Sequence, residues 1–303
     1  MPERLDILKT YKLFIDGAFP RSESGRSTPV LARGGRVLAH VARASRKDLR
    51  DAVEAARRAQ PRWGDATAYL RAQILYRMAE MMEGKRREFA EALEAAPSSQ
   101  VRGTKPKASR SAKPRTSAAD EVSLAVDRLV AFAGWADKFA QVLGCQNPVA
   151  GPFYNFTVPE PTGVVAVVAP DEAPLLALIS LLAPPLCAGN AVVAVASNVN
   201  PLPAAILGEV VATSDVPAGV LNILTGERGE LLGHIAGHRD VDAVHWGGLS
   251  PPEDQLLREG VAENLKRVAD RAGVDWRDAA ICQSPWWIEN FVEFKTIWHP
   301  SAM

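Results

Sequence analysis

The strongest constraint on the fold is an alternation of short apolar runs with helix-like segments between residues 163 and 250. Gly163 to Ala169 reads GVVAVVA and Ala191 to Ala196 reads AVVAVA, which is typical of strands buried on both faces of a sheet. Val220 to Leu224 and Val241 to Trp246 are expected to be the third and fourth strands. Helices are expected between them, over residues 173–188, 201–213 and 230–238. Strands that alternate with helices predict a doubly wound parallel sheet, and therefore an α/β fold.

The N-terminal part of the chain predicts two hairpins followed by helices. Asp16-Gly17 suits a two-residue hairpin turn, and a second hairpin is expected around Gly34-Gly35. Ser45 is expected to cap a helix over 46–60 that Pro61 ends. Further helices are expected over residues 68–83, 86–95, 120–142 and 252–271. Two extended segments, 151–160 and 291–298, read as strands.

Residues 96–119 contain six basic residues, no acidic residue and few large hydrophobic ones. This composition favours a mobile loop. Contact with nucleic acid is the alternative, but no aromatic residue is interleaved with the basic ones. The chain has 35 basic and 35 acidic residues, so no global charge points to nucleic acid or to an anionic membrane. We therefore expect neither as a partner.

The sequence favours a cytoplasmic protein. Its first residues, MPERLDILKTYKLF, lack a long apolar stretch, so no secretory signal is expected. The most apolar stretch, 173–188, contains three prolines and is too short to span a bilayer. The three cysteines, Cys145, Cys187 and Cys282, are too few and too scattered for a disulfide framework or a zinc site.

Several sequence blocks, taken together and in order, are similar to a known family. They are PEPTGVVAVVAP (159–170), LLAPPLCAGNAVVAV (181–195), NPLPA (200–204), DVPAGVLNILTG (215–226) and FVEFKTIWHP (291–300). With these blocks the chain resembles the aldehyde dehydrogenase superfamily. It is most similar to the shortened, non-catalytic second half of aldehyde dehydrogenase family sixteen, here as a stand-alone chain.

The resemblance implies an organisation in two parts. Residues 1–142 and 161–275 would form a degenerate cofactor-type α/β domain, with a helical N-terminal segment. Residues 143–160 and 285–303 would form a β oligomerisation arm. Only 57 residues run from Gly247 to the end of the sequence, so we expect the family's thiol-bearing catalytic domain to be absent.

The resemblance also identifies positions where family members bind the cofactor and the oxyanion. The family's Pro-Trp-Asn motif is replaced here by residues 170–172, and Glu172 takes the place of the oxyanion-stabilising Asn. Its Lys-Pro-Ser-Glu motif is replaced by residues 195–198, where Val195 cannot donate a hydrogen bond to a ribose hydroxyl. Its Phe-Thr-Gly-Ser motif is replaced by residues 246–249.

These replacements predict a degenerate cofactor site. Pro251 and Pro252 follow the last motif and remove two backbone N–H groups that could bind phosphate. The degenerate candidates for cofactor contact are Ala169, Pro170, Val195, Ser197, Asn198, Gly226, Gly247 and Gly248. We expect no bound cofactor; NAD(P) is the alternative.

No catalytic residue is expected. The family's Asn-x-Gly-Gln-x-Cys and Glu-Leu-Gly-Gly motifs do not occur in the sequence, and Cys282 lies in the different context AAICQSPWW. His234, His238 and His245 could suggest a metal site, but they lack a partner cluster of cysteines or carboxylates. Solvated or capping histidines are the favoured interpretation.

Formation of an interface with another chain is the function whose sequence segments remain intact. The arm concentrates the candidate interface residues Phe153, Tyr154, Phe156, Phe291, Phe294, Lys295, Ile297 and Trp298. These residues could instead close the protein's own core. The main hypothesis is a non-catalytic assembly or regulatory subunit, which forms a homo-oligomer, binds a full-length aldehyde dehydrogenase, or does both. The alternatives are a divergent NAD(P)-dependent aldehyde oxidoreductase, a nucleotide-binding protein, and one product of a split gene.

Overall fold

A parallel sheet lies at the centre of the computed structural model, which describes residues 7–32, 34–96 and 117–301. The strand order is β10-β9-β6-β7-β8, and every neighbouring pair is parallel. The strands are β6 (Val164–Val168), β7 (Ala191–Val195), β8 (Leu221–Leu224), β9 (Ala243–Trp246) and β10 (Arg267–Asp270). This arrangement confirms the predicted doubly wound α/β fold.

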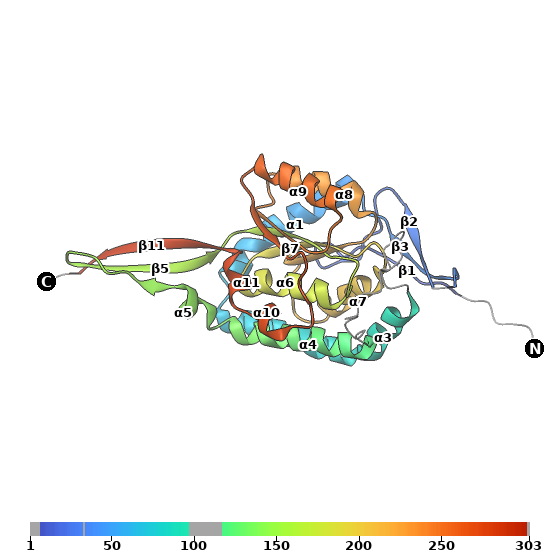
Figure 1. Cartoon of the computed structure of the whole chain (residues 1–303), viewed down its shortest axis with the longest axis horizontal. Helices are drawn as coiled ribbons and strands as arrows, with labels where there is room; N and C mark the ends of the chain where they lie inside the picture. The colour runs from blue at the N-terminus through green and yellow to red at the C-terminus, as the bar shows by residue number, and fades with distance from the viewer. Residues whose placement is uncertain (1–6, 33, 97–116, 302–303) are drawn as a thin grey trace, which may run out of the picture.

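Helices cover both faces of this sheet, and alternate strand residues pack against each layer (Figure 1). Val164 and Val168 of β6 pack with the first layer, which comprises α1 (Arg46–Gly64), α8 (Arg228–Gly237) and α9 (Pro251–Ala262). Val165 and Val167 pack on the opposite side. That layer comprises α2 (Ala68–Gly84), α3 (Arg86–Ala95), α4 (Ala118–Trp135), α5 (Phe139–Leu143), α6 (Leu176–Ala188) and α7 (Leu202–Val211). Both faces of β6 and β7 are buried, which explains why these two strands contain no polar residue.

The N-terminal hairpins are present. β1 (Thr10–Tyr11), β2 (Ser27–Leu31) and β3 (Val37–Ala42) form a small sheet in the order β1-β3-β2. Asp16 and Gly17 both have positive φ, as the predicted hairpin turn requires, and Ile15 bridges Ala18 across it. Among the described residues none of the helices is long and apolar enough to cross a membrane.

Three predicted helix boundaries are wrong. Pro61 does not end α1, which continues to Gly64, since a proline in the last turn removes only one helical hydrogen bond. The helix expected over 120–142 is divided into α4 and α5, because the chain tightens after Trp135 and Ala136 N–H bonds the carbonyls of both Phe132 and Ala133.

The last predicted helix, 252–271, is also shorter than expected. α9 ends at Ala262, and Leu265 adopts a positive φ of 52° that a helix cannot contain. Arg267–Asp270 then form β10, which pairs with β9. Most of the expected loop over 96–119 lies outside the described residues, but Ser117 caps α4 and Ala118 already belongs to that helix.

A narrow arm of three strands projects from the body (Figure 1). It contains β4 (Cys145–Gln146), β5 (Phe153–Pro161) and β11 (Val292–Pro300) in the order β11-β5-β4. β5 and β11 pair antiparallel from Phe153–Pro300 to Pro161–Val292. The short helices α10 (Ala279–Cys282) and α11 (Trp286–Glu289) lead from the body into β11.

Candidate functional site

The carboxyl ends of β6, β7 and β8 converge on Arg228. In open parallel sheets, ligands bind outside this edge. Residues 169–172 follow β6, residues 196–198 follow β7, and Arg228 begins α8 after β8. The Arg228 side chain is 5% exposed, so it fills the region between these segments rather than extending into solvent.

Arg228 forms hydrogen bonds with the segments that follow β6 and β7 and with the start of α9. Its Nη1 donates to the carbonyl oxygen of Ala169 at 2.9 Å, and its Nη2 donates to Asp171 Oδ2 at 3.1 Å. Its Nε donates to Glu253 Oε1 at 3.0 Å, at the start of α9. The backbone N–H of Arg228 donates to Asn198 Oδ1 at 2.9 Å. One guanidinium therefore joins the carboxyl end of β6 to the start of α9, and two carboxylates balance its charge.

Asp171 holds the segment that follows β7. Its Oδ1 accepts hydrogen bonds from Ser197 Oγ at 2.8 Å and from the backbone N–H of Asn198 at 2.8 Å. The backbone N–H of Val199 approaches the same oxygen at 3.3 Å. The Ser197 hydroxyl and the backbone N–H groups of Asn198 and Val199 are thus directed to Asp171 within the chain.

The N-terminus of α9 is capped by a side chain of the protein itself. Glu253 Oε2 accepts from the backbone N–H of Ser250 at 2.9 Å and from its hydroxyl at 2.7 Å. Burial opposes ionisation of Glu253, but the hydrogen bonds from Ser250 and Arg228 outweigh it and hold the pKa of this carboxyl below its ordinary value. Asp254 adds a second carboxylate in the first turn. This helix end offers negative charge where a phosphate would need donors.

Three glycines among the candidates have packing roles. Gly226 has φ of 126°, and a Cβ there would lie 2.9 Å from the backbone nitrogen of Ala44. A Cβ on Gly247 would lie 2.8 Å from the ring of Trp276. Gly248 has φ of 62°, and its Cβ would meet Pro170 at 2.9 Å. Each glycine permits a close contact within the chain.

The remaining candidates divide between the core and the surface. Ala169, Pro170, Val195 and Ser197 are buried, whereas Asn198 is exposed. Val195 is the last residue of β7 and packs in the sheet. Glu172 is exposed in the loop between β6 and α6, where it contributes an electrostatic interaction to Arg277.

The cysteines lie apart in the fold. Cys187 is fully buried in α6, and burial raises the pKa of its thiol to about 12. Cys282 is buried in α10, and its Sγ lies 3.5 Å from the carbonyl oxygen of Asp275. Cys145 is exposed on the arm, with its Sγ 3.1 Å from Asn147 Oδ1.

The histidines do not form a cluster with other metal ligands anywhere in the described ranges. His234 is exposed, and His238 Nδ1 accepts the backbone N–H of Asp240 at 3.2 Å. The expectation of a solvated or capping residue is wrong for His245, which belongs to β9 and is fully buried. Arg271 Nε donates to its Nε2 at 3.0 Å, so Nδ1 carries the proton and donates to the Leu181 carbonyl oxygen at 2.8 Å.

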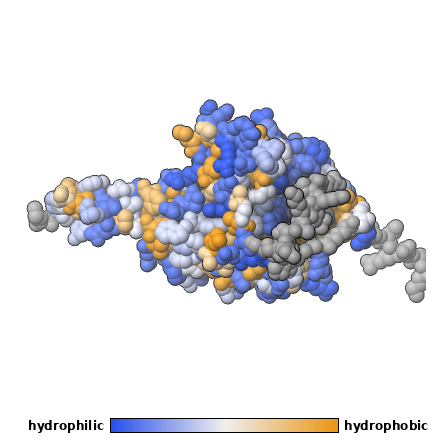
Figure 2. Space-filling view, in the orientation of Figure 1, coloured by the Kyte–Doolittle hydropathy of each residue, from blue (hydrophilic) through white to orange (hydrophobic). Residues whose placement is uncertain are grey.

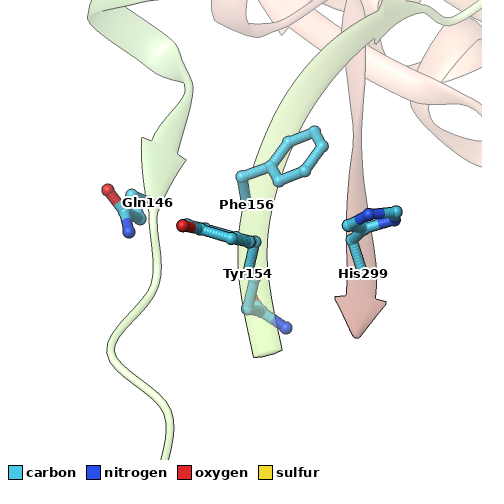
Figure 3. Close-up of a pocket in the computed structure, with 5 residues that line it drawn as sticks. Gln146, Tyr154, Phe156 and His299 are labelled. Atoms are coloured by element: carbon cyan, nitrogen blue, oxygen red, sulfur yellow. The ribbon is translucent and has the colours of Figure 1, made fainter. Parts of the chain in front are cut away.

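The arm presents a second candidate site. A hollow of about 330 Å³ is lined by Gln146, Tyr154, Asn155, Phe156 and His299. Figure 3 shows that Gln146 comes from β4, Tyr154 and Phe156 from β5, and His299 from β11. Another hollow, of about 560 Å³, lies between α4 and α10 beside Trp135. Neither hollow is lined by Asp171, Arg228 or Glu253.

The predicted interface residues are mostly exposed on the arm, where Figure 2 shows hydrophobic patches. The large exposed side chains among them are Phe153, Tyr154, Phe156, Phe294 and Trp298. Lys295 is exposed and Ile297 is half-buried. Phe291 is fully buried and its ring lies 4.7 Å from that of His245, so it packs in the core at the base of the arm.

Arg228, Asp171 and Glu253 are central to the site and were not among the residues selected from the sequence. Arg228 and Asp171 are 57 positions apart, and Arg228 and Glu253 are 25 apart. The available signal was weak: each residue follows a predicted strand at the same edge of the sheet. Asp171 stands in the altered segment 170–172, and Glu253 directly follows Pro251 and Pro252.

Comparison with known proteins agrees with this fold. The aldehyde dehydrogenase family model matches residues 21–275. The chain is 33% identical over 266 residues to a mitochondrial benzaldehyde dehydrogenase of Antirrhinum majus, covering 86% of this chain and 47% of that protein. It is 33% identical over 269 residues to the 2-hydroxymuconic semialdehyde dehydrogenase of Pseudomonas sp. (strain CF600), covering 88% and 53%. The chain thus spans about half the length of the curated relatives it matches.

Solved structures give the same result. The NAD+ complex of aldehyde dehydrogenase from Bacillus cereus superposes with a TM-score of 0.76 at 28% identity, covering 88% of this chain and 51% of that one. An E. coli NADP-dependent enzyme superposes with a TM-score of 0.77 at 25% identity, covering 88% and 52%. The predicted resemblance is confirmed: the chain belongs to the aldehyde dehydrogenase family.

Proposed function

We propose that this chain is a non-catalytic member of its family that binds no NAD(P) and acts as an assembly or regulatory subunit. The observation that carries the proposal is Arg228, which fills the carboxyl edge of the sheet and is bonded to Ala169, Asp171 and Glu253. The partner is a second copy of the chain, a full-length aldehyde dehydrogenase, or both. We place the protein in the cytoplasm, where its free thiols stay reduced.

The charges at this edge do not suit a dinucleotide. A pyrophosphate is bound by free N–H groups at a helix N-terminus and by positive charge. Here Pro251 and Pro252 begin α9, and Glu253 and Asp254 place two carboxylates in its first turn. Arg228 is the nearby cation, but two carboxylates already neutralise it. The residues present therefore do not fit the cofactor.

The thiols also support a non-catalytic role. A nucleophilic cysteine needs an accessible thiolate with a lowered pKa. Cys187 has the opposite character, since burial raises its pKa to about 12. Cys282 is buried, and Cys145 lies on the arm away from the carboxyl edge of the sheet.

The first test is cofactor titration. Purified chain would be titrated with NAD+ and NADP+ by calorimetry, with a full-length aldehyde dehydrogenase as the positive control. We expect no heat of binding from this chain at millimolar cofactor. Micromolar binding of either nucleotide would overturn the proposal and favour the oxidoreductase or nucleotide-binding alternative.

The second test is assembly. Light scattering would give the mass of the chain alone and mixed with candidate full-length aldehyde dehydrogenases. We expect a complex larger than one chain of 32.6 kDa. A strict monomer that associates with none of them would contradict an assembly role.

A further inference from the structure

The hollow of about 560 Å³ between α4 and α10 lies on the body and not on the strands of the arm. α4 and the turn after it contribute Ala131, Gly134, Trp135 and Lys138 to its lining, and residues between 279 and 285 contribute the rest. Figure 1 shows α4 along the lower side of the body, with α10 beside it. The family model matches this chain only up to residue 275, so the α10 side of the hollow lies outside the matched region.

Large apolar side chains around this hollow are exposed. Val130 on α4 is 39% exposed and Trp286 on α11 is 56% exposed, and each directly adjoins a lining residue in the sequence. The ring of Trp135 is held in place, because its Nε1 donates to the carbonyl oxygen of Gln283 at 3.0 Å. Figure 2 shows hydrophobic residues on the face that carries α10 and α11. Exposed apolar side chains gathered around a hollow indicate a contact surface.

One stripe of α4 borders the hollow and carries a charge at each end. Asp127, Ala131 and Gly134 share a face of the helix, and Lys138 continues this face just beyond the helix end. The Asp127 carboxylate is exposed and forms no hydrogen bond or salt bridge within the ranges that the structure describes. The exposed Lys138 ammonium donates to the Gly134 carbonyl oxygen and to Asp137, which leaves its third N–H available.

We propose that a second copy of this chain packs on this face, with its α4 antiparallel to α4 of the first copy and a two-fold axis between Ala131 and Gly134. The inference rests on the proposed assembly role, and it specifies both the partner and a contact surface on the body. An isologous contact uses the same surface of both copies and closes as a dimer. The strands of the arm take no part in it.

The stripe is complementary to itself in this arrangement. Asp127 faces Lys138 of the second copy, so the dimer contains two carboxylate–ammonium pairs, one at each end of the contact. Ala131 faces Gly134 of the second copy, and these small residues at the axis allow the two helices to approach closely. A second copy is therefore an occupant whose charges match those of the stripe.

The exposed apolar side chains meet in the same register. Val130 faces Trp135 of the second copy, so the valine enters the hollow beside the fixed indole ring. With Ala131 itself on the axis, Trp135 would instead face the Asp127 carboxylate of the second copy. That register would leave the charge of Asp127 without its ammonium partner.

Other arrangements also lose the charge pairs. In a parallel arrangement Asp127 would face Asp127 of the second copy and Lys138 would face Lys138, and like charges repel. With Gly134 on the axis of an antiparallel pair, Lys138 would face Val130 of the second copy. The charges therefore select the antiparallel contact with its axis between positions 131 and 134.

Charge reversal tests the pairing. Asp127→Lys places two ammonium groups opposite each other at both ends of the contact, and Lys138→Asp places two carboxylates there. We expect either variant to raise the dissociation constant of the dimer by about tenfold or more, because directly opposed like charges disfavour association. Light scattering over a dilution series measures this change as a fall of the mass towards half, and circular dichroism shows that each variant is folded.

The two reversals should compensate for each other. The double variant Asp127→Lys/Lys138→Asp again places opposite charges at both ends of the contact, so it should recover the wild-type mass. An equimolar mixture of the two single variants should do the same, because each copy then carries the charges that the other lacks. Recovery in both experiments would show that the two residues face each other across the contact.

A longer side chain at the axis tests the contact without changing its charge. A Cβ on Gly134 meets no atom within 4 Å, so one chain accommodates Gly134→Gln, whereas the second copy would collide with the new side chain. We expect the mass to fall towards half with an unchanged circular dichroism spectrum. Gly233→Gln is the matched control, since Gly233 is also exposed inside a helix with open space around it, and it should leave the mass unchanged.

The outcomes separate this inference from the assembly role. Self-association that is unchanged in Asp127→Lys and Gly134→Gln, or that the double reversal fails to recover, would overturn the inference and leave an assembly role through another surface. A chain that is monomeric alone but forms a complex with a full-length aldehyde dehydrogenase would also overturn it, and the assembly role would survive. Only a monomer without any complex would remove both.

Discussion

The guanidinium of Arg228 meets the carboxylate of Asp171 at 3.1 Å, although 57 positions separate the two residues in the chain. The pair connects the start of α8, which follows β8, with the segment that follows β6, and Glu253 at 3.0 Å extends it to α9. Because the Arg228 side chain is only 5% exposed, water screens this network little. A region that could receive a ligand is thereby used to stabilise the fold.

Replacement of Arg228 should lower the free energy of unfolding. Arg228→Ala leaves Asp171, Glu253 and the Ala169 carbonyl without their donor, and breaking a buried ion pair from one side costs about 3 kcal/mol. Urea unfolding followed by circular dichroism would measure the loss. Arg258→Ala is a matched control, since its pairs with Asp254 and Asp270 lie at the surface with Arg258 49% exposed, and it should cost less than about 1 kcal/mol. Equal losses for the two variants would contradict the role given to Arg228.

Replacement by alanine should destabilise the protein at Gly226 and stabilise it at Gly233. Gly226→Ala introduces strain at φ of 126° and a contact of 2.9 Å with Ala44 N, so we expect a loss of about 2 kcal/mol or more. Gly233 lies within α8, with no atom within 4 Å of its added Cβ, so Gly233→Ala should stabilise the protein by about 1 kcal/mol. Thermal unfolding of both variants would measure the difference. Destabilisation of both to a similar degree would show that the close approach at Gly226 is not the cause.

His245 should make the protein sensitive to acid. Burial, followed by the positive charge of Arg271, lowers the pKa of His245 well below its ordinary value of 6.5. Above pH 6.5 the imidazole is neutral in both folded and unfolded chains and contributes no pH dependence. Below pH 6.5 only the unfolded chain gains the proton, so stability falls by about 1.4 kcal/mol per pH unit until the folded pKa is reached.

A neutral substitute isolates this effect. In His245→Gln the amide N–H can donate to Leu181 and the amide oxygen can accept from Arg271, without any titration. Urea unfolding of both proteins at pH 7 and pH 5 should show a smaller loss on acidification for the variant. Equal losses would mean that His245 does not cause the acid sensitivity.

The central sheet could be predicted from the sequence because its pattern is local. β6 and β7 consist entirely of apolar residues, and burial on both faces is what such runs require. β10 could not be recognised in this way. Its residues, RVAD, are half polar and Val268 is 38% exposed, so only pairing with β9 makes them a strand. The same residues continue the apolar spacing of the preceding helix, which produced the wrong helix over 252–271.

The candidate site was harder to predict than the sheet. The motif comparison identified altered segments after β6, β7 and β9. It did not reveal that Arg228 would fold back into them, because a charged residue in the first turn of a helix is ordinarily solvated. Its burial depends on Asp171 and Glu253, which come from two other segments and carry no sequence pattern that links them to Arg228.

Glu121 provides a last test of how the body is held together. Its Oε1 accepts the backbone N–H of Leu175 at 3.0 Å and that of Leu176 at 3.3 Å, so a residue of α4 caps the start of α6. Burial is the leading influence on Glu121 and raises the pKa of its carboxyl in spite of these bonds. Glu121→Ala should cost about 1 kcal/mol, because it leaves the helix N–H groups without an acceptor.

Two further variants test whether loss of the helix cap causes the destabilisation expected for Glu121→Ala. Glu121→Gln keeps an oxygen acceptor and avoids burial of a charge, so it should cost less than Glu121→Ala. Asp120→Ala removes an exposed neighbouring carboxylate that accepts a hydrogen bond from Ser117 in its own helix turn, and it should cost roughly 0.3 kcal/mol. Urea unfolding at pH 7 would rank the three variants. If Glu121→Gln were as harmful as Glu121→Ala, the stabilisation would depend on the charge of the carboxylate and not on its role as an acceptor for α6.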